Sequence, residues 1–328
     1  MKRMFFVVAL LFAITPIGKA QITTSHAAAP VEKSTTIAVY DSTRNWIGND
    51  NVASYKGQLL YVNGKSESLR GYGYDDFKTK KEPGTLSGRY GNPAASSSFN
   101  TKYEDLVGKY FTVLDVQPDS QQKTYPSLYG KVWWFLLQNR DDTTDTVWFR
   151  YSGEFQHSFP FITISYFNYL KSRIGTKYVV SYSIREDNTF VSRVNEHDFY
   201  TGELIKQSKT DRWECIDVTI EDKYFNLVLV VKNQNGDVSI INQYNLEELN
   251  GELFVFEEKE FNNLVAKYGA GNMDMVRQHK VRVGMPEKLV IMSWGTPDKI
   301  NRSSYGPNQW VYDNQYVYIE NGKVTAWN

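Results

Sequence analysis

Residues Val283–Ile300 read VGMPEKLVIMSWGTPDKI, a short helix with its own start and stop signals. Pro286 suits the first helical position, because its φ is already fixed and its missing N–H would have no partner there. Gly295 ends the helix, and Pro297 prevents its continuation. The apolar face of this helix consists of Leu289, Val290, Met292 and Trp294. The pattern predicts two helical turns that need another element to cover their apolar face.

The segments around this helix predict a small α+β module over residues 270–328. A second helix is expected around Asn272–His279. Turn signals separate three short strands, which are Gln309–Tyr312, Gln315–Glu320 and Lys323–Trp327. None of these elements is large enough to be stable alone, so the two helices must cover one face of the three-stranded sheet.

The rest of the chain favours strands. Phe, Tyr and Trp make up 15% of the residues, and such rings suit pleated surfaces. The polar segment Lys78–Asn100 has no apolar period and is expected to be a long loop. Alternation and apolar runs predict strands at Gly57–Asn63, Lys109–Val116, Val132–Asn139, Asp145–Tyr151, Lys177–Ile184, Arg212–Val218, Phe225–Asn233 and Asp237–Tyr244.

An internal repeat connects residues 101–185 with residues 186–269. KYFTVLDV resembles DRWECIDV, which places Asp115 on Asp217, and VWWFLLQN resembles NLVLVVKN, which places Asn139 on Asn233. YFNYLKSRIG then falls on EFNNLVAKYG. Chance similarity between two hairpins is the alternative, but we favour duplication because the register continues into the helix. Each copy is expected to contain a strand, a hairpin and a helix that ends at glycine and docks on the sheet.

Residues 1–20 have the pattern of a secretory signal peptide. A basic start is followed by an apolar stretch too short to span a bilayer, and small residues precede the expected cleavage after Ala20. A second possible cut lies in Ala27–Ala29. Residues 21–100 are expected to form a leader and an N-terminal β/loop region. No cysteine lies directly after the apolar stretch, where a lipid would be attached. We therefore expect an exported protein without a lipid anchor, either periplasmic or secreted.

Charge and cysteine content exclude several classes of function. Without the signal, 34 basic residues face 37 acidic ones, so the mature net charge is about −3, which argues against nucleic acid as a partner. Cys215 is the only cysteine, which rules out an internal disulfide. We expect no transmembrane span, no cofactor and no metal site. The sequence leaves the oligomeric state open.

Asp115 and Asp217 are the candidates for catalysis. Two carboxylates at equivalent strand positions would suit acid/base work on a glycan if they faced each other. The alternative, which we favour, is that each carboxylate accepts hydrogen bonds in its own strand end or turn. Similarly, Glu196-His197-Asp198 favours a polar turn over a metal site, and Cys215 favours a buried thiol over a nucleophile.

Aromatic side chains are the candidates for binding. Trp133 and Trp134 are neighbours on one predicted strand and therefore point to opposite faces of the sheet, with Trp148 on the next strand. An exposed ring would suit a glycan or a protein interface, whereas a sheet covered on both faces would bury it. Trp310 and Tyr316 in the C-terminal module complete the predicted binding set.

The C-terminal 50 residues resemble the SmpA/OmlA, or BamE-like, family of outer-membrane assembly lipoproteins. The resemblance follows the pattern Gly284-Met285, Val290, Gly295 with Pro297, Trp310 to Tyr312, and Gly322 with Val324. It implies an α+β module that binds proteins or envelope components. Related units also occur in tandem in a secreted β-lactamase inhibitor.

We therefore expect a β-rich α+β protein that binds an envelope protein or polymer without catalysis. The alternatives are an envelope glycan hydrolase that uses Asp115 and Asp217, and a secreted protein inhibitor.

Overall fold

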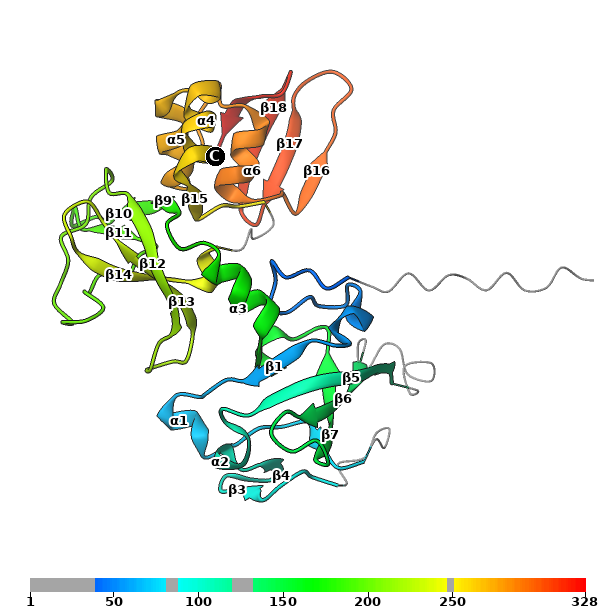
Figure 1. Cartoon of the computed structure of the whole chain (residues 1–328). Helices are drawn as coiled ribbons and strands as arrows, with labels where there is room; N and C mark the ends of the chain where they lie inside the picture. Colours follow the sequence, from blue (N-terminus) through cyan, green and yellow to red (C-terminus); the bar gives the residue numbers. More distant parts are fainter. Residues whose placement is uncertain (1–38, 81–87, 120–131, 247–250) are drawn as a thin grey trace, which may run out of the picture. The chain divides into compact units, whose positions relative to one another are not determined.

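The computed structural model describes residues 39–80, 88–119, 132–246 and 251–328 (Figure 1). In these residues strands account for 37% and helices for 20%, and the sheets are antiparallel. The prediction of a β-rich α+β protein is therefore confirmed. The predicted signal peptide and the first part of the leader lie outside the described residues.

The first sheet has six antiparallel strands in the order β2-β7-β6-β5-β1-β8. Its strands are β1 (Leu59–Val62), β2 (Phe77–Lys78), β5 (Tyr110–Pro118), β6 (Val132–Asn139), β7 (Thr146–Ser152) and β8 (Phe161–Thr163). One face carries a core of stacked and tilted rings, in which Phe135 lies between Tyr55 and Tyr151. Short elements flank this sheet: η1 (Val52–Tyr55), α1 (Glu67–Arg70), α2 (Tyr103–Leu106), η3 (Gln156–Ser158) and the hairpin of β3 (Pro93–Ala94) with β4 (Ser97–Thr101).

The second sheet has five antiparallel strands in the order β14-β13-β12-β9-β15. Its strands are β9 (Lys177–Val180), β12 (Trp213–Ile220), β13 (Leu227–Lys232), β14 (Val238–Asn242) and β15 (Val255–Glu257). A small hairpin of β10 (Tyr182–Ile184) with β11 (Phe190–Ser192) follows β9, and η4 (Gln243–Asn245) follows β14. The core on one face of this sheet contains Trp213, Cys215 and Leu229.

Apart from β2, the two sheets share their strand order, since β7-β6-β5-β1-β8 corresponds to β14-β13-β12-β9-β15. They also share a β-bulge. The register shifts once between β5 and β6, at Val113/Asp115, and once between β12 and β13, at Cys215/Asp217. Each β-bulge places one extra residue in the ladder. The extra residue at each bulge is aliphatic and partly exposed: Leu114 and Ile216 are each 37% exposed. The predicted match of Asp115 with Asp217 therefore falls on the same structural feature.

A buried asparagine closes the corresponding strand in each sheet: Asn139 is the last residue of β6, and Asn233 directly follows β13. The side-chain amide of Asn139 donates to Asp145 Oδ2 at 3.1 Å, and that of Asn233 donates to Asp237 Oδ2 at 2.8 Å. The Oδ1 atoms accept backbone N–H groups of the adjoining turns, at 3.0 Å from Asp141 and 2.9 Å from Asn235. The two hairpins therefore close in the same way, although their turns differ in length.

A helix follows the last strand of each sheet, as predicted from the repeat. β8 continues into α3 (Ile164–Lys171), and β15 continues into α4 (Glu258–Tyr268). Leu170 and Phe261 are buried, while Phe167 and Leu264 are partly buried against the cores. The expected docking faces are therefore confirmed for both helices.

The C-terminal segment contains both expected helices. They are α5 (Ala270–Arg277) and α6 (Glu287–Trp294), and Gly295 ends α6 with a φ of 80°. Figure 1 shows α6 beside β17, and α5 packs against α4 and α6. The sheet has the order β16-β17-β18-β19. Its strands are β16 (Lys299–Asn301), β17 (Asn308–Tyr312), β18 (Gln315–Glu320) and β19 (Lys323–Trp327).

Three corrections to the sequence analysis concern strands. The C-terminal sheet has four strands, because Lys299–Asn301 pairs with β17 without any apolar alternation of its own. The segment Lys177–Ile184 is two strands, since the Ser181 N–H donates to Phe254 while its carbonyl accepts from Arg193. Within Lys78–Asn100, the described part contains β3 and the start of β4 and is not purely a loop; residues 81–87 lie outside the described residues.

Candidate ligand-binding groove

A groove of about 530 Å³ opens in the C-terminal module, and we call it the terminal groove. Its volume falls within the range of ordinary ligand sites, roughly 300–1,000 Å³. The side chains that line it and matter for its chemistry are Glu252, Trp294, Asp298, Tyr312, Asp313 and Gln315. No lysine or arginine among the described residues lines the terminal groove.

The ends of two elements position these side chains. Trp294 is the last residue of α6, and the turn at Gly295 leads the chain directly to Asp298. On the other side, Tyr312 ends β17 and faces Gln315 across the turn to β18. Asp313 occupies that turn with a φ of 44°, a conformation that Asp and Asn tolerate better than most residues. The groove therefore lies where a helix C-terminus meets a hairpin turn.

Three aromatic rings form rigid walls around one corner of the module. The Trp294 ring stands at 82° to Tyr312 and at 89° to Trp327, with centroid separations of 5.5 and 6.4 Å. The Trp294 indole N–H donates to the His279 carbonyl at 2.8 Å. The Tyr312 hydroxyl donates to the Gly295 carbonyl at 3.0 Å. Because the indole N–H and the phenol hydroxyl are already hydrogen-bonded, Trp294 and Tyr312 present their ring carbons to the groove.

The electrostatic potential of the terminal groove is negative. Asp298 accepts the Asp313 N–H at 2.9 Å, which brings two carboxylates to one turn, and Glu252 lies 2.7 Å from His279 Nδ1. Burial, followed by the negative charge of Asp298, raises the pKa of the Tyr312 phenol. The C-terminus of α6 adds partial negative charge, and its last turn has no basic residue to offset it.

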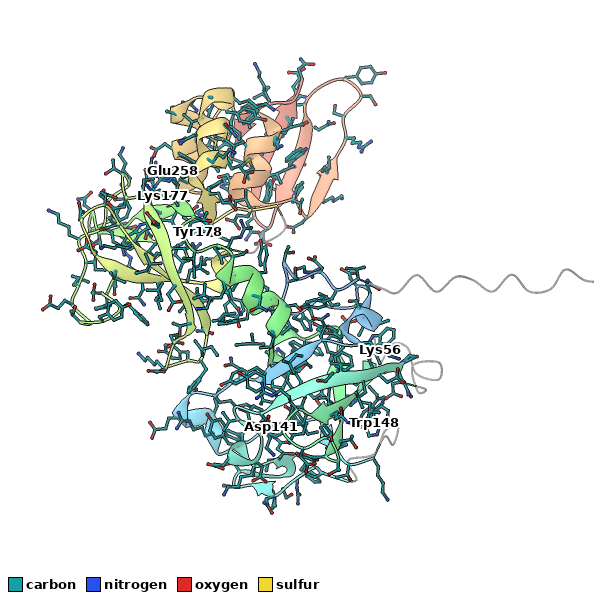
Figure 2. The ribbon with its side chains drawn as sticks, viewed as in Figure 1. Lys56, Asp141, Trp148, Lys177, Tyr178 and Glu258 are labelled. Carbon is teal, nitrogen blue, oxygen red and sulfur yellow. The ribbon has the colours of Figure 1, made fainter. Side chains whose placement is uncertain are left out.

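The structure distributes the five predicted binding residues over different surroundings. Trp134 and Trp310 are only 1% and 6% exposed, so they lie in the interior. Trp133, Trp148 and Tyr316 are half-buried. Trp148 lies on β7 (Figure 2). Register with Val311 places Tyr316 on the sheet face opposite to Trp310. These side chains do not form one site, and a binding role for them stays a prediction.

Sequence reasoning misses the terminal groove, although it identifies most of the residues in its walls. It assigns Trp294 to an apolar helix face and Tyr312 to a strand, which are both correct. The groove arises because a helix end and a hairpin turn meet in space. The missed signal is that an aromatic residue at the end of an element is followed closely by an acidic residue in two places, as Trp294 with Asp298 and as Tyr312 with Asp313.

Asp115 and Asp217 each form an ion pair with a lysine from outside the strands of their sheet. Asp115 accepts from Lys56 at 3.2 Å, and Asp217 accepts from Lys171 at 2.7 Å (Lys56 is marked in Figure 2). Hydrogen bonds from Gln117, and to a lesser extent Lys56, lower the pKa of Asp115, and a bond from Lys171 lowers that of Asp217. A lowered pKa suits a permanent anion and opposes the role of proton donor. Each carboxylate also accepts a bond from its own strand, Asp115 from the Gln117 amide at 2.7 Å and Asp217 from the Val218 N–H at 2.8 Å, as the favoured alternative expects.

The remaining candidates for chemistry are structural in the described part of the chain. Cys215 is fully buried, and burial raises the pKa of its thiol to about 11. Asp198 accepts the backbone N–H groups of Tyr200, Thr201 and Val238, which fixes the turn after His197. In the described residues, no group of three metal-ligating side chains has the geometry of a metal site.

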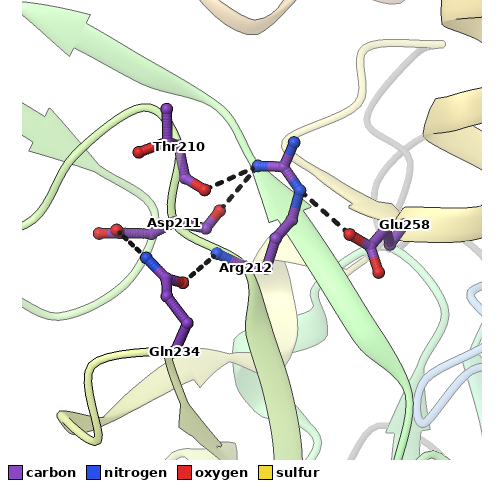
Figure 3. Close-up of polar contacts among 5 residues, drawn as sticks. All are labelled: Thr210, Asp211, Arg212, Gln234 and Glu258. Carbon is purple, nitrogen blue, oxygen red and sulfur yellow. Dashed lines mark hydrogen bonds and ion pairs between the residues drawn. The ribbon is translucent and has the colours of Figure 1, made fainter.

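A second hollow, about 450 Å³, is lined by the cations Lys177, Arg212 and Lys232. Arg212 in this hollow forms bonds to several other residues of the protein (Figure 3). Its guanidinium pairs with Glu258 of α4 at 3.2 Å and donates to the carbonyls of Thr210 and Asp211, while its N–H donates to Gln234. These bonds fix the start of β12 to α4, so Arg212 has a structural role at this hollow.

The environment of Asp76 disfavours the charged form of its carboxyl group. Burial, and then the charge of Asp75, raise the pKa of Asp76 to about 6 from 3.8, although Arg150 lies 3.9 Å away. The Asp76 carboxyl group therefore binds its proton more tightly in the folded state than in the unfolded state. The associated stability is complete below pH 3.8 and is lost as the pH rises through about 6.

We expect Asp76→Asn to raise the free energy of unfolding by about 2 kcal/mol at pH 8, because it removes the buried charge. Asn also tolerates the left-handed conformation at this position, where φ is 65°. Urea unfolding at pH 8 and pH 4 measures the change, and the gain disappears at pH 4. Asp222→Asn, on an exposed residue that is not among the groups acting on Asp76, is the control with little effect. A loss of stability at pH 8 would mean that the pair with Arg150 outweighs burial.

Comparisons of the chain with family models, curated proteins and solved structures found no match. Within the described residues, no helix combines the length and the apolar character that a membrane crossing requires.

Proposed function

We propose that this protein is an exported, non-enzymatic binding protein of the bacterial cell envelope, and that its C-terminal module makes the contact. The observation that carries the proposal is the terminal groove, whose aromatic walls are fixed by hydrogen bonds from Trp294 and Tyr312. Preformed concave sites with apolar walls and a few oriented polar groups are typical of ligand binding. The signal-like pattern of residues 1–20 supports export.

We further propose that the two larger sheets are copies of one duplicated unit. The shared strand order, the matching bulges and the buried residues Asn139 and Asn233 support this interpretation. Each unit places its last strand at the edge of the sheet and continues into a helix, where both can pack against the next unit of the chain. Repeated units that share apolar surface are a common way to build an extended binding protein.

The third part of the proposal concerns residues 270–328, which we assign to a module that resembles the SmpA/OmlA family. The support is the order of α5, α6 and an antiparallel meander, with helix and turn boundaries at the glycines of the pattern. An adapter role in the envelope would be consistent with that resemblance.

The glycan hydrolase and inhibitor alternatives have weaker support. A glycosidase needs one carboxyl with a raised pKa close to a second carboxylate. Asp115 and Asp217 instead form separate ion pairs, and both have lowered pKa values. No specific observation favours an inhibitor over a general binding protein.

Retention of envelope components on immobilised protein tests the proposed function. Mature protein and the variant Trp327→Ala are coupled to two columns, and detergent-solubilised envelope protein and purified envelope polymer are passed over both. The variant removes the ring that packs edge to face against the groove residue Trp294, at 6.4 Å. Trp327 is 49% exposed, so its truncation leaves the core intact. We expect a component that the first column retains and the second loses. Equal retention on both columns would contradict a function of the terminal groove.

A further inference from the structure

We infer that the terminal groove recognises a basic segment of a partner protein, with a lysine or arginine side chain held between the aromatic walls and the carboxylates. This inference rests on the proposed binding function and specifies its ligand. The juxtaposition that carries it is a fixed corner of aromatic rings beside three acidic side chains, in a groove that no described cationic side chain lines.

The aromatic corner provides the first half of the recognition. A cation over the face of a tryptophan or tyrosine is attracted by the ring quadrupole, by about 0.5–2 kcal/mol depending on desolvation. Elsewhere in the chain such faces are already occupied, for example that of Tyr110, which Arg140 covers at 3.9 Å. No described cation lies over Trp294, Tyr312 or Trp327 at comparable range, so this corner has the arrangement of the occupied sites without the cation.

The carboxylates provide the second half. Asp313 makes no side-chain hydrogen bond or ion pair within the described part of the chain, so its charge is available to a ligand. The Asp298 carboxylate beside it uses Oδ2 for the Asp313 N–H and keeps Oδ1 available. A guanidinium or ammonium group would find charge-assisted acceptors here, which are the stronger class of hydrogen bond.

The edges of the groove favour a peptide over a small free cation. Asn314 and Gln315 form one edge, and their side-chain amides have no hydrogen-bond partner among the described residues. Amides both donate and accept, as the main chain of an extended peptide requires. A volume of about 530 Å³ also exceeds what a single ammonium group fills, so neighbouring residues of the segment have room.

A fluorescent tetralysine peptide is the probe for this inference, titrated at low salt against the mature protein by fluorescence anisotropy. The double variant D298N/D313N removes two groove charges, keeps the side-chain shapes and retains an acceptor for the Asp313 N–H. We expect it to weaken binding about tenfold, which corresponds to about 1.4 kcal/mol. Trp327→Ala is expected to weaken binding about threefold or more.

The matched control is E287Q/E320Q. It removes the same number of charges from exposed positions of the same module, at the N-terminus of α6 and at the far end of β18. We expect a change below twofold. The same peptide with acetylated lysines keeps the stems but loses the charge, and it is expected to bind at least tenfold more weakly.

Three results would overturn the inference: equal weakening by D298N/D313N and by the control, equal binding of the acetylated peptide, or no binding of tetralysine at all. A neutral N-acetylglucosamine hexamer separates this failure from failure of the proposed function. If Trp327→Ala weakens hexamer binding while D298N/D313N does not, the groove binds a glycan, so the binding function stands and the basic ligand is wrong.

Discussion

Replacing Asn233 by alanine is expected to lower the free energy of unfolding by about 2–4 kcal/mol, and Asn139→Ala is expected to have a similar effect. Asn233 is only 5% exposed, and its side chain bonds Asp237 and two backbone N–H groups. Alanine removes three partly buried hydrogen bonds, and each such bond contributes about 0.5–1.5 kcal/mol. Asn139 is 7% exposed and bonds Asp145 and the Asp141 N–H in the same way.

The proposed duplication is tested by comparing how much each variant changes the free energy of unfolding. Urea unfolding of both variants gives the values, with Asn235→Ala and Thr143→Ala as controls on exposed residues of the same two turns. These controls are expected to change stability by no more than about 0.5 kcal/mol. If one buried asparagine proves neutral while the other is essential, the two hairpins do not close by the same device and the equivalence is wrong.

Hydrophobic pattern alone predicted the long strands well. The strand Val132–Asn139 has the predicted bounds, because a continuous apolar run bounded by turn residues admits few other structures. Helix α6 ends where Gly295 requires it to end. The prediction also matched Asp115 with Asp217, and each of them directly follows the bulge in its sheet.

Features that depend on distant partners could not be predicted in this way. The break at Ser181 is set by Phe254, far along the chain, and β16 exists only because β17 offers it an edge. The ion pairs of Asp115 and Asp217 join residues 59 and 46 positions apart. The terminal groove belongs to the same class, because its walls come from segments that meet only in the folded module.

Replacing Phe256 by alanine is expected to lower the free energy of unfolding by about 3–5 kcal/mol, the usual range for a buried phenylalanine. Phe256 is 2% exposed and belongs to β15, which pairs with β9 in the second sheet. Its ring nevertheless lies in the C-terminal core with Met273 and Leu289, and it packs edge to face against Phe261 at 5.7 Å. One side chain therefore contributes to two regions of the fold.

The Phe256→Ala variant tests whether the C-terminal module is stable by itself. If the core is shared, hydrogen exchange read by mass spectrometry will show faster exchange in β13 and in β18 together in Phe256→Ala. The neighbouring Val255 is partly buried in the core of the second sheet instead. Val255→Ala is therefore expected to cost less and to affect β13 more than β18. Faster exchange confined to β18 in Phe256→Ala would show that the module unfolds independently, because small elements that shared a core would lose protection as one cooperative unit.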